Sequence, residues 1–242
     1  MSQWSDPYQS NPLSGWREAG TSNPVLRRFF NAVYGWMCVG LAITGAVAWI
    51  VATDYQSMAL MGKGIWLLFI VEIVLVMAVA GAINRINATV ATILFLIYSA
   101  INGVILSGIF LVYAHNQGTL ASAFFISAGT FGAMSLYGMF TKTNLAPLGR
   151  YLFMGLIGII IASIVSIFWH NSLLEVAINY IGVLLFVALT AYDTQRLKGI
   201  AVQTQDSPSM AARMAIVGSL MLYLDFINLF LFILSLMSDR RR

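Results

Sequence analysis

The stretch SLMLYLDFINLFLFIL, residues 219–234, decides the fold class of this chain. It lies in an apolar run, 213–237, that is long enough to cross a bilayer, since a spanning helix needs roughly 20 mostly apolar residues. Asp225 stands near the middle of this run, where its carboxylate cannot reach water. A charge in that position costs roughly 2.5–3.5 kcal/mol on insertion scales. We therefore expect Asp225 to face the interior of a helix bundle, where it is protonated, paired or in contact with a cavity, and Asn228 on the same helical face to add a polar contact.

The composition places the whole chain among membrane proteins. Hydrophobic residues make up 60% of the 242 residues, charged residues make up 9%, and the mean hydropathy is +0.84. A soluble domain needs more charge to cover its surface. The net charge of +4 is spread over the ends of apolar runs, as membrane topology requires, and does not indicate a nucleic-acid partner. One cysteine, Cys38, and two histidines make no disulfide and no metal cluster.

The apolar runs predict an all-α integral membrane protein with seven transmembrane helices. These runs are 29–52, 65–83, 88–112, 119–140, 148–168, 174–193 and 213–237. Residues 29–237 would form the transmembrane domain. Residues 1–28, rich in Ser, Asn, Pro and Gly, would form a disordered cytoplasmic tail, and 238–242 a short basic tail.

Basic residues gather in alternate loops, which predicts a cytoplasmic N-terminus. On that side lie Arg17, Arg27, Arg28, Arg85, Lys142, Arg150, Arg196, Lys198 and Arg213. The opposite loops hold only Lys63, together with the acids Asp54 and Glu175. Seven crossings place the basic C-terminus outside, against the rule, so a re-entrant last segment is the alternative. We prefer a full crossing, because the run after Arg213 is long and strongly apolar.

A second acid, Asp193, occurs in LTAYDTQRLK, residues 189–198, at the end of the sixth run. It could simply open a loop. It could also meet Asp225 if the sixth helix continues to about Gly199, and residues 194–198 contain no helix breaker. Two carboxylates at close range titrate as a coupled unit, because like charges repel. Such a pair is sensitive to protons and offers oxygen ligands to a hard cation such as calcium.

The second run holds one more ionisable residue, Glu72, and a second, Arg85, follows its end. Arg85 could neutralise the aspartate pair and hold a gate shut, or it could be a plain anchor at the cytoplasmic surface. Glu72 could be a second station on an ion path, or a buried neutral acid bonded to a neighbour. The sequence leaves both alternatives open.

Small residues recur at four-residue spacing and predict close packing of helices in the bundle. The pairs are Gly40 with Thr44, Gly103 with Ser107, and Ala128 with Gly132.

An intramembrane aspartyl protease is the enzymatic alternative, because two carboxyl groups that share a proton can activate water. Such enzymes carry Gly-x-Gly-Asp at the second acid, where this chain has LYLD, residues 222–225, and the chain also lacks their Pro-Ala-Leu element. His115 and His170 have no Gly-x-Ser-x-Gly partner for serine chemistry. We expect no enzymatic activity.

The two aspartate stretches, 189–198 and 219–234, resemble the paired signature of the Bax inhibitor-1 family, the transmembrane Bax inhibitor motif proteins. The stretches NGVILSGIFLVY, residues 102–113, and ASAFFISAGTFGAMSLYG, residues 121–138, are similar to the central motif of that family. The resemblance extends from about Val33 to Leu236, and it is greatest to bacterial inner-membrane members.

The resemblance implies six helices around a central seventh helix that carries Asp225. It implies a pH-sensitive calcium leak in which Asp193 and Asp225 sense protons and contact the ion. Arg85 matches the latch to these aspartates, and Glu72 matches an acid of the second helix. Some bacterial relatives instead modulate an inner-membrane quality-control protease, and this is our alternative function. The expected partners are thus the lipid bilayer, calcium or another cation, and a membrane protease complex, with no cofactor.

Overall fold

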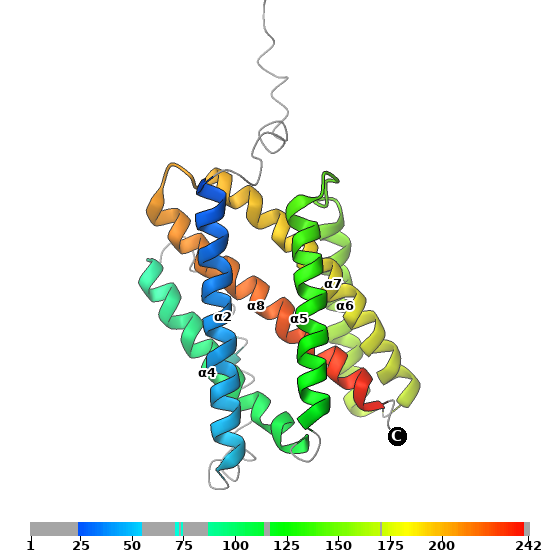
Figure 1. The fold of residues 1–242 in the computed structure, drawn as a ribbon. Coiled ribbons are helices and arrows are strands. Elements are labelled where there is room, and N and C mark those ends of the chain that lie inside the picture. Colours follow the sequence, from blue (N-terminus) through cyan, green and yellow to red (C-terminus); the bar gives the residue numbers. More distant parts are fainter. Residues whose placement is uncertain are drawn as a thin grey trace, which may run out of the picture.

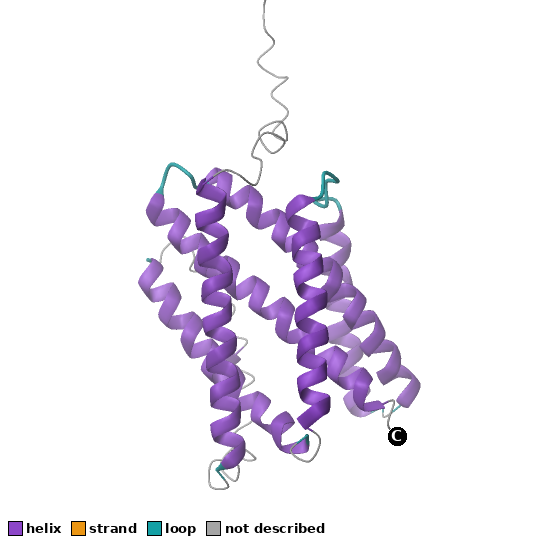
Figure 2. Cartoon of the chain, viewed as in Figure 1, coloured by secondary structure: helices purple, strands orange, loops and turns teal. Residues whose placement is uncertain are grey.

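A computed structural model of the chain describes residues 24–54, 71, 72, 74, 87–113, 117–169 and 171–239. This part of the chain forms a bundle of six helices (Figure 1) and contains no strand (Figure 2). The helices are α2 (Pro24–Thr53), α4 (Ala88–Val112), α5 (Gln117–Phe140), α6 (Leu148–Phe168), α7 (Ser172–Gln203) and α8 (Pro208–Asp239). All six are long and apolar enough to cross a membrane. The protein is therefore an all-α, multi-pass membrane protein.

Six of the seven predicted spans coincide with these helices. The predicted span 65–83 lies outside the described residues, apart from residues 71, 72 and 74, which are helical. The predicted disordered tail falls mainly on residues 1–23, also outside the described part, and α2 begins at Pro24. Of the predicted C-terminal tail, α8 includes residues 238 and 239, and residues 240–242 are not described.

Asparagine and proline define where several helices begin. The side chain of Asn87 accepts a hydrogen bond from the backbone N–H of Val90 at the start of α4. Asn171 likewise accepts from the N–H groups of Leu173 and Leu174 at the start of α7. These side chains satisfy backbone donors that have no partner inside the helix. Pro24 and Pro208 are the first residues of α2 and α8, where a missing N–H costs nothing.

Helix α8 is the most buried of the described helices. It contacts α2, α4, α5 and α7, and it runs obliquely across the bundle behind α2 and α5 (Figure 1). In an apolar stretch of 18 residues, 56% of the residues of α8 are buried. The corresponding share is 6% for α6, which packs mainly on α7. The helix is unbroken at Asp225, which favours the full crossing that we expected over a re-entrant segment.

Close approach of helices depends on glycine at particular positions. A Cβ atom at Gly40 would collide with the ring of Phe95, and one at Gly103 would collide with the backbone of Thr44. Both glycines lie between α2 and α4, so the expected close packing is confirmed there. A Cβ atom at Gly132 would meet nothing within 4 Å. The spacing of Ala128 and Gly132 therefore marks no helix contact at Gly132.

Gly138 provides a test of this packing, because a Cβ atom there would run into the carbonyl group of Ala191 on α7. We expect Gly138→Val to push α5 from α7 and to lower the free energy of unfolding by about 1–3 kcal/mol, the usual cost of overpacking. Reversible unfolding in detergent micelles measures this loss. Gly132→Val on the same helix is the control, and equal stability of the two variants would contradict the packing described here.

Candidate functional site

The structure brings Asp193 and Asp225 into one region of the bundle. Helix α7 continues past Asp193 to Gln203, so the expected extension of this helix through Gly199 is confirmed. Helices α7 and α8 run antiparallel, with Leu197 against Gly218 and Gly182 against Phe232. This register places Asp193 about one helical turn from the level of Asp225.

Both carboxyl groups are buried in the bundle. Asp225 is 5% exposed and Asp193 is 9% exposed. They lie close enough for the charge of Asp193 to act on the carboxyl group of Asp225. The Oδ2 atom of Asp225 has no hydrogen-bond partner among the described residues. The amide of Asn228 donates to the carbonyl oxygen of Leu224 at 2.8 Å, and the described residues show no hydrogen bond between Asn228 and Asp225.

The two acids differ in their nearest charges. Arg196 lies three residues beyond Asp193 on α7, and its charge acts on that carboxyl group. For Asp225, Asp193 is the one charged group found to act on it within the described part of the chain. Arg196 therefore has a second role beside that of a topology signal, and its i, i+3 spacing from Asp193 in the sequence indicates this role.

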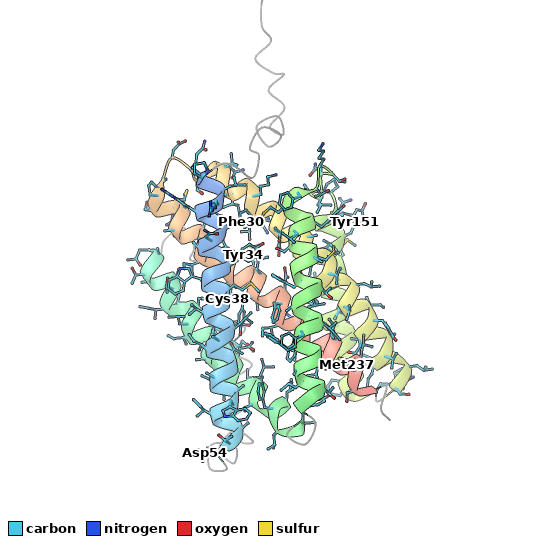
Figure 3. All side chains as sticks on the ribbon, viewed as in Figure 1. Phe30, Tyr34, Cys38, Asp54, Tyr151 and Met237 are labelled. Atoms are coloured by element: carbon cyan, nitrogen blue, oxygen red, sulfur yellow. The ribbon has the colours of Figure 1, made fainter. Side chains whose placement is uncertain are left out.

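A chain of hydroxyl groups from three helices lies beside Asp193. Thr194 donates its only hydroxyl proton to the carbonyl oxygen of Thr190 at 2.7 Å, so it accepts from Ser135, 3.0 Å away. The Ser135 proton is then used, so the hydroxyl of Tyr34 must donate to Ser135. Tyr34 lies on the first half of α2 (Figure 3). The chain thus connects α2, α5 and α7. Its residues lie on separate helices, so no spacing in the sequence connects them.

A second hydroxyl chain holds α8 two residues before Asp225. Thr44 donates to the carbonyl oxygen of Ser99 at 2.8 Å and accepts from the hydroxyl of Tyr223 at 2.6 Å. The Tyr223 ring stands edge-on to the rings of Phe95 and Tyr98. Tyr223 is fully buried, so these contacts fix α8 against α2 and α4.

Polar side chains that follow Asp193 hold the loop between α5 and α6. The side chain of Gln195 accepts from the N–H of Leu145 at 2.7 Å and donates to the carbonyl oxygen of Thr143 at 2.8 Å. Lys198 donates to the carbonyl oxygen of Met139 at 3.3 Å. The residues that continue α7 beyond Asp193 therefore connect it to the neighbouring helix pair.

Of the other two predicted site residues, the structure describes only Glu72. Glu72 is half-buried and accepts a hydrogen bond of 2.5 Å from the amide of Asn102 on α4. The same amide lies 3.4 Å from the hydroxyl of Tyr98, and the Asn102 Oδ1 atom has no partner among the described residues. Glu72 is therefore hydrogen-bonded to a neighbour, which agrees with one of the two alternatives that the sequence left open for it. Arg85 lies outside the described residues, and its role as a latch stays a prediction.

The aspartate pair supplies only part of a calcium site. Calcium takes six to eight oxygen ligands, and two carboxylates provide at most four oxygens. Within the described ranges, no three His, Cys, Asp or Glu side chains gather in a metal-binding group. The arrangement suits brief contact with a cation better than tight binding.

The hydroxyl chain beside Asp193 predicts an energetic coupling between Tyr34 and Ser135. Hydrogen bonds between transmembrane helices contribute about 0.6 kcal/mol on average. We expect a coupling of this size or somewhat larger in a double-mutant cycle of Tyr34→Phe and Ser135→Ala, measured from unfolding in micelles. Tyr137→Phe, on the exposed face of α5, combined with Ser135→Ala is the control cycle and should be additive. A coupling of zero between Tyr34 and Ser135 would contradict the hydroxyl chain.

Comparison with known proteins agrees with the resemblance found in the sequence. Residues 26–242 match the family model described as inhibitor of apoptosis-promoting Bax1. The chain is 45% identical over 221 residues to the inner membrane protein YbhL of Escherichia coli K12, covering 89% of this chain and 93% of that protein. It is 42% identical over 220 residues to a protein of Borreliella burgdorferi, with coverage of 90% and 94%. For a protein of Deinococcus radiodurans the identity is 38% over 216 residues, with coverage of 89% and 92%. This chain belongs to the Bax inhibitor-1 family.

Proposed function

We propose that this protein is a pH-sensitive cation leak of the bacterial inner membrane, with calcium as the permeant ion and with Asp193 and Asp225 as its gate. The observation that carries the proposal is the burial of two interacting carboxyl groups about one turn apart on α7 and α8. Ionisable groups inside a membrane are costly, and they commonly mark ion pathways or proton relays. The Oδ2 atom of Asp225, which has no hydrogen-bond partner among the described residues, is available to a proton or a cation.

The proposed gate works through proton sharing. Two carboxylates at short range repel each other when both are ionised, so the pair takes up and releases a proton as one unit. Loss of that proton adds a negative charge between α7 and α8, which attracts a cation and weakens the contact between the two acids. The charge of Arg196 reaches Asp193, so the two members of the pair respond unequally.

The topology that we propose has seven spans, six of them around α8, with the N-terminus in the cytoplasm. Helices α2 and α4 run in the same direction, since Gly40 lies by Phe95 and Gly103 lies by Thr44. A further crossing at 65–83, between these two helices, meets that requirement. Contacts of α8 with four other helices support its central position. Helix α2 begins and α8 ends at opposite ends of the bundle, as an odd number of spans requires (Figure 1).

In this proposal calcium is the transported ion, and Arg85 and Glu72 assist its passage. Conduction needs several sites along a path that each bind the ion weakly. A pair of acids with few further ligands would be one such weak site. Glu72, hydrogen-bonded to Asn102, would be the second station, and Arg85 would neutralise the pair in the shut state. We expect no enzymatic chemistry at this site.

Modulation of an inner-membrane quality-control protease remains the alternative function. Contacts among the described residues do not favour it over a leak, and the Escherichia coli relative is named only as an inner membrane protein. It becomes the leading hypothesis if the purified protein carries no ions.

Calcium flux into proteoliposomes loaded with a calcium-sensitive dye tests the leak directly. We expect the wild-type protein to pass calcium at a rate that changes between pH 6 and pH 8. Asp193→Asn and Asp225→Asn should each remove most of this change, because a single remaining carboxyl group no longer shares a proton with a partner. Glu175→Gln, an exposed acid at the start of α7, is the matched control and should keep the wild-type profile.

Two results would overturn the proposal. Wild-type flux equal to that of empty liposomes would exclude a leak. A pH profile unchanged in both aspartate variants would exclude the pair as the gate.

Substitution of Arg85 tests the latch. We expect Arg85→Gln to raise basal calcium flux several-fold at the pH where the wild type is most closed, because the positive charge that neutralises the pair is lost. Arg85→Lys keeps the charge and should stay near the wild-type rate. Equal flux in all three proteins, measured at equal protein density in the liposomes, would identify Arg85 as a topology anchor only.

A further inference from the structure

An apolar cavity of about 440 Å³ lies between α2, α4, α5 and α8. It occupies the end of the bundle where α2 and α4 end and α5 begins. Its walls are mostly aliphatic and aromatic, and Phe226 and Ile227 of α8 form its inner side. The volume falls within the range of roughly 300–1,000 Å³ that is typical of small-ligand sites.

The cavity is continuous with the lipid-facing surface of the bundle. Trp49 on α2 and Phe125 on α5 both line it, and they are 55% and 72% exposed. Ala48 and Phe226, deeper in the same cavity, are 0% and 4% exposed. A path therefore leads sideways from the bilayer, between α2 and α5, to the buried face of α8. The bilayer already covers the outer surface of these two helices.

The dimensions of the cavity match one leaflet of a membrane. Its α2 wall runs from Leu41 to Thr53, which is about 18 Å of helix at 1.5 Å per residue. Half of a hydrocarbon core that is about 30 Å thick is about 15 Å. An apolar cavity stays dry and accepts apolar ligands, so water is a poor occupant. Trp49 and Tyr113 line the cavity towards the helix ends, where aromatic side chains favour the membrane surface.

From these observations we propose that the cavity binds one acyl chain of a membrane phospholipid. The chain enters between α2 and α5, from the leaflet at the end where α2 stops at Thr53, and lies against Phe226 and Ile227 of α8. Asp54, at that end of α2, marks the side of the bundle concerned (Figure 3). The assignment of this site does not rest on the proposed ion leak.

Gly45 offers a way to fill the cavity without disturbing the fold. It lines the cavity, and a Cβ atom at this position would meet nothing within 4 Å. A phenylalanine there has room to project into the space that we assign to the acyl chain. Gly35 is a matched control on the same helix, because a Cβ atom there also meets nothing within 4 Å and Gly35 does not line the cavity.

Photolabelling with a phospholipid that carries a diazirine in its acyl chain tests the proposal. The full-length protein is reconstituted in phosphatidylethanolamine and phosphatidylglycerol vesicles with this probe, irradiated, and mapped by mass spectrometry. We expect labels on Ala48, Phe226 and Ile227, which are buried from bulk lipid. Gly45→Phe should lower these labels several-fold, and Gly35→Phe should leave them unchanged. Labels on exposed residues such as Phe153 of α6 should be equal in the wild type and both variants, which would show that all three proteins are reconstituted equally.

Absence of label on the three buried residues of the wild-type protein would overturn the proposal, as would equal labelling in the two glycine variants. Hydroxyl-radical oxidation of Phe226 in the same vesicles would show water in the cavity and would also overturn it. Ala121→Phe fills the cavity from the α5 wall. It keeps the test decisive if Gly45→Phe does not fold.

Discussion

A carboxyl group in the middle of a transmembrane helix must be enclosed by protein, and this constraint organises the bundle. Asp225 is 5% exposed on a helix of 32 residues. Exposure of such a group to lipid would cost several kcal/mol, so α8 has to be surrounded by other helices. It contacts α2, α4, α5 and α7, whereas the mostly lipid-exposed α6 contributes little to the enclosure. The position of the acid on α8 thus determines which helix is buried and which is peripheral.

Lipid provides no hydrophobic drive for helix association, so close contacts and polar bonds must hold the helices around Asp225. One hydroxyl chain connects Tyr34, Ser135 and Thr194 beside Asp193, and another connects Tyr223 and Thr44 beside Asp225. Each chain ends on a backbone carbonyl group, so the direction of every hydroxyl proton is fixed. Such chains cannot pass a proton along without rotating each hydroxyl. Their geometry therefore suits holding the aspartate helices in place more than proton transfer.

Hydropathy predicted six described helices because each span is a long apolar run, with a clear limit at Asn87 before α4. It began the last span at residue 213, although α8 begins at Pro208. It ended the sixth span at Asp193, ten residues before Gln203, because the last turns of α7 are polar and bond to the α5–α6 loop. Asp193 and Asp225 could be identified from the sequence, because each is an ionisable residue in an apolar run, where a charge is energetically costly. The partners of Ser135 were not, because side-chain contacts between helices depend on rotation and register, which hydropathy does not contain. The same limit explains why the spacing of Gly132 predicted a contact that is absent.

Adjacent residues of α8 face two different environments, because successive side chains on a helix point about 100° apart. Asp225 lies near Asp193 on α7, while Phe226 packs edge-on against Phe124 and Phe131 of α5 and lines the apolar cavity. Both side chains belong to one rigid helix that Tyr223 fixes to α2. A shift of α8 that changes the separation of the two acids must also break the aromatic contacts of Phe226. The energy needed to disturb the aspartate pair is therefore set partly by the apolar packing on the neighbouring face of α8.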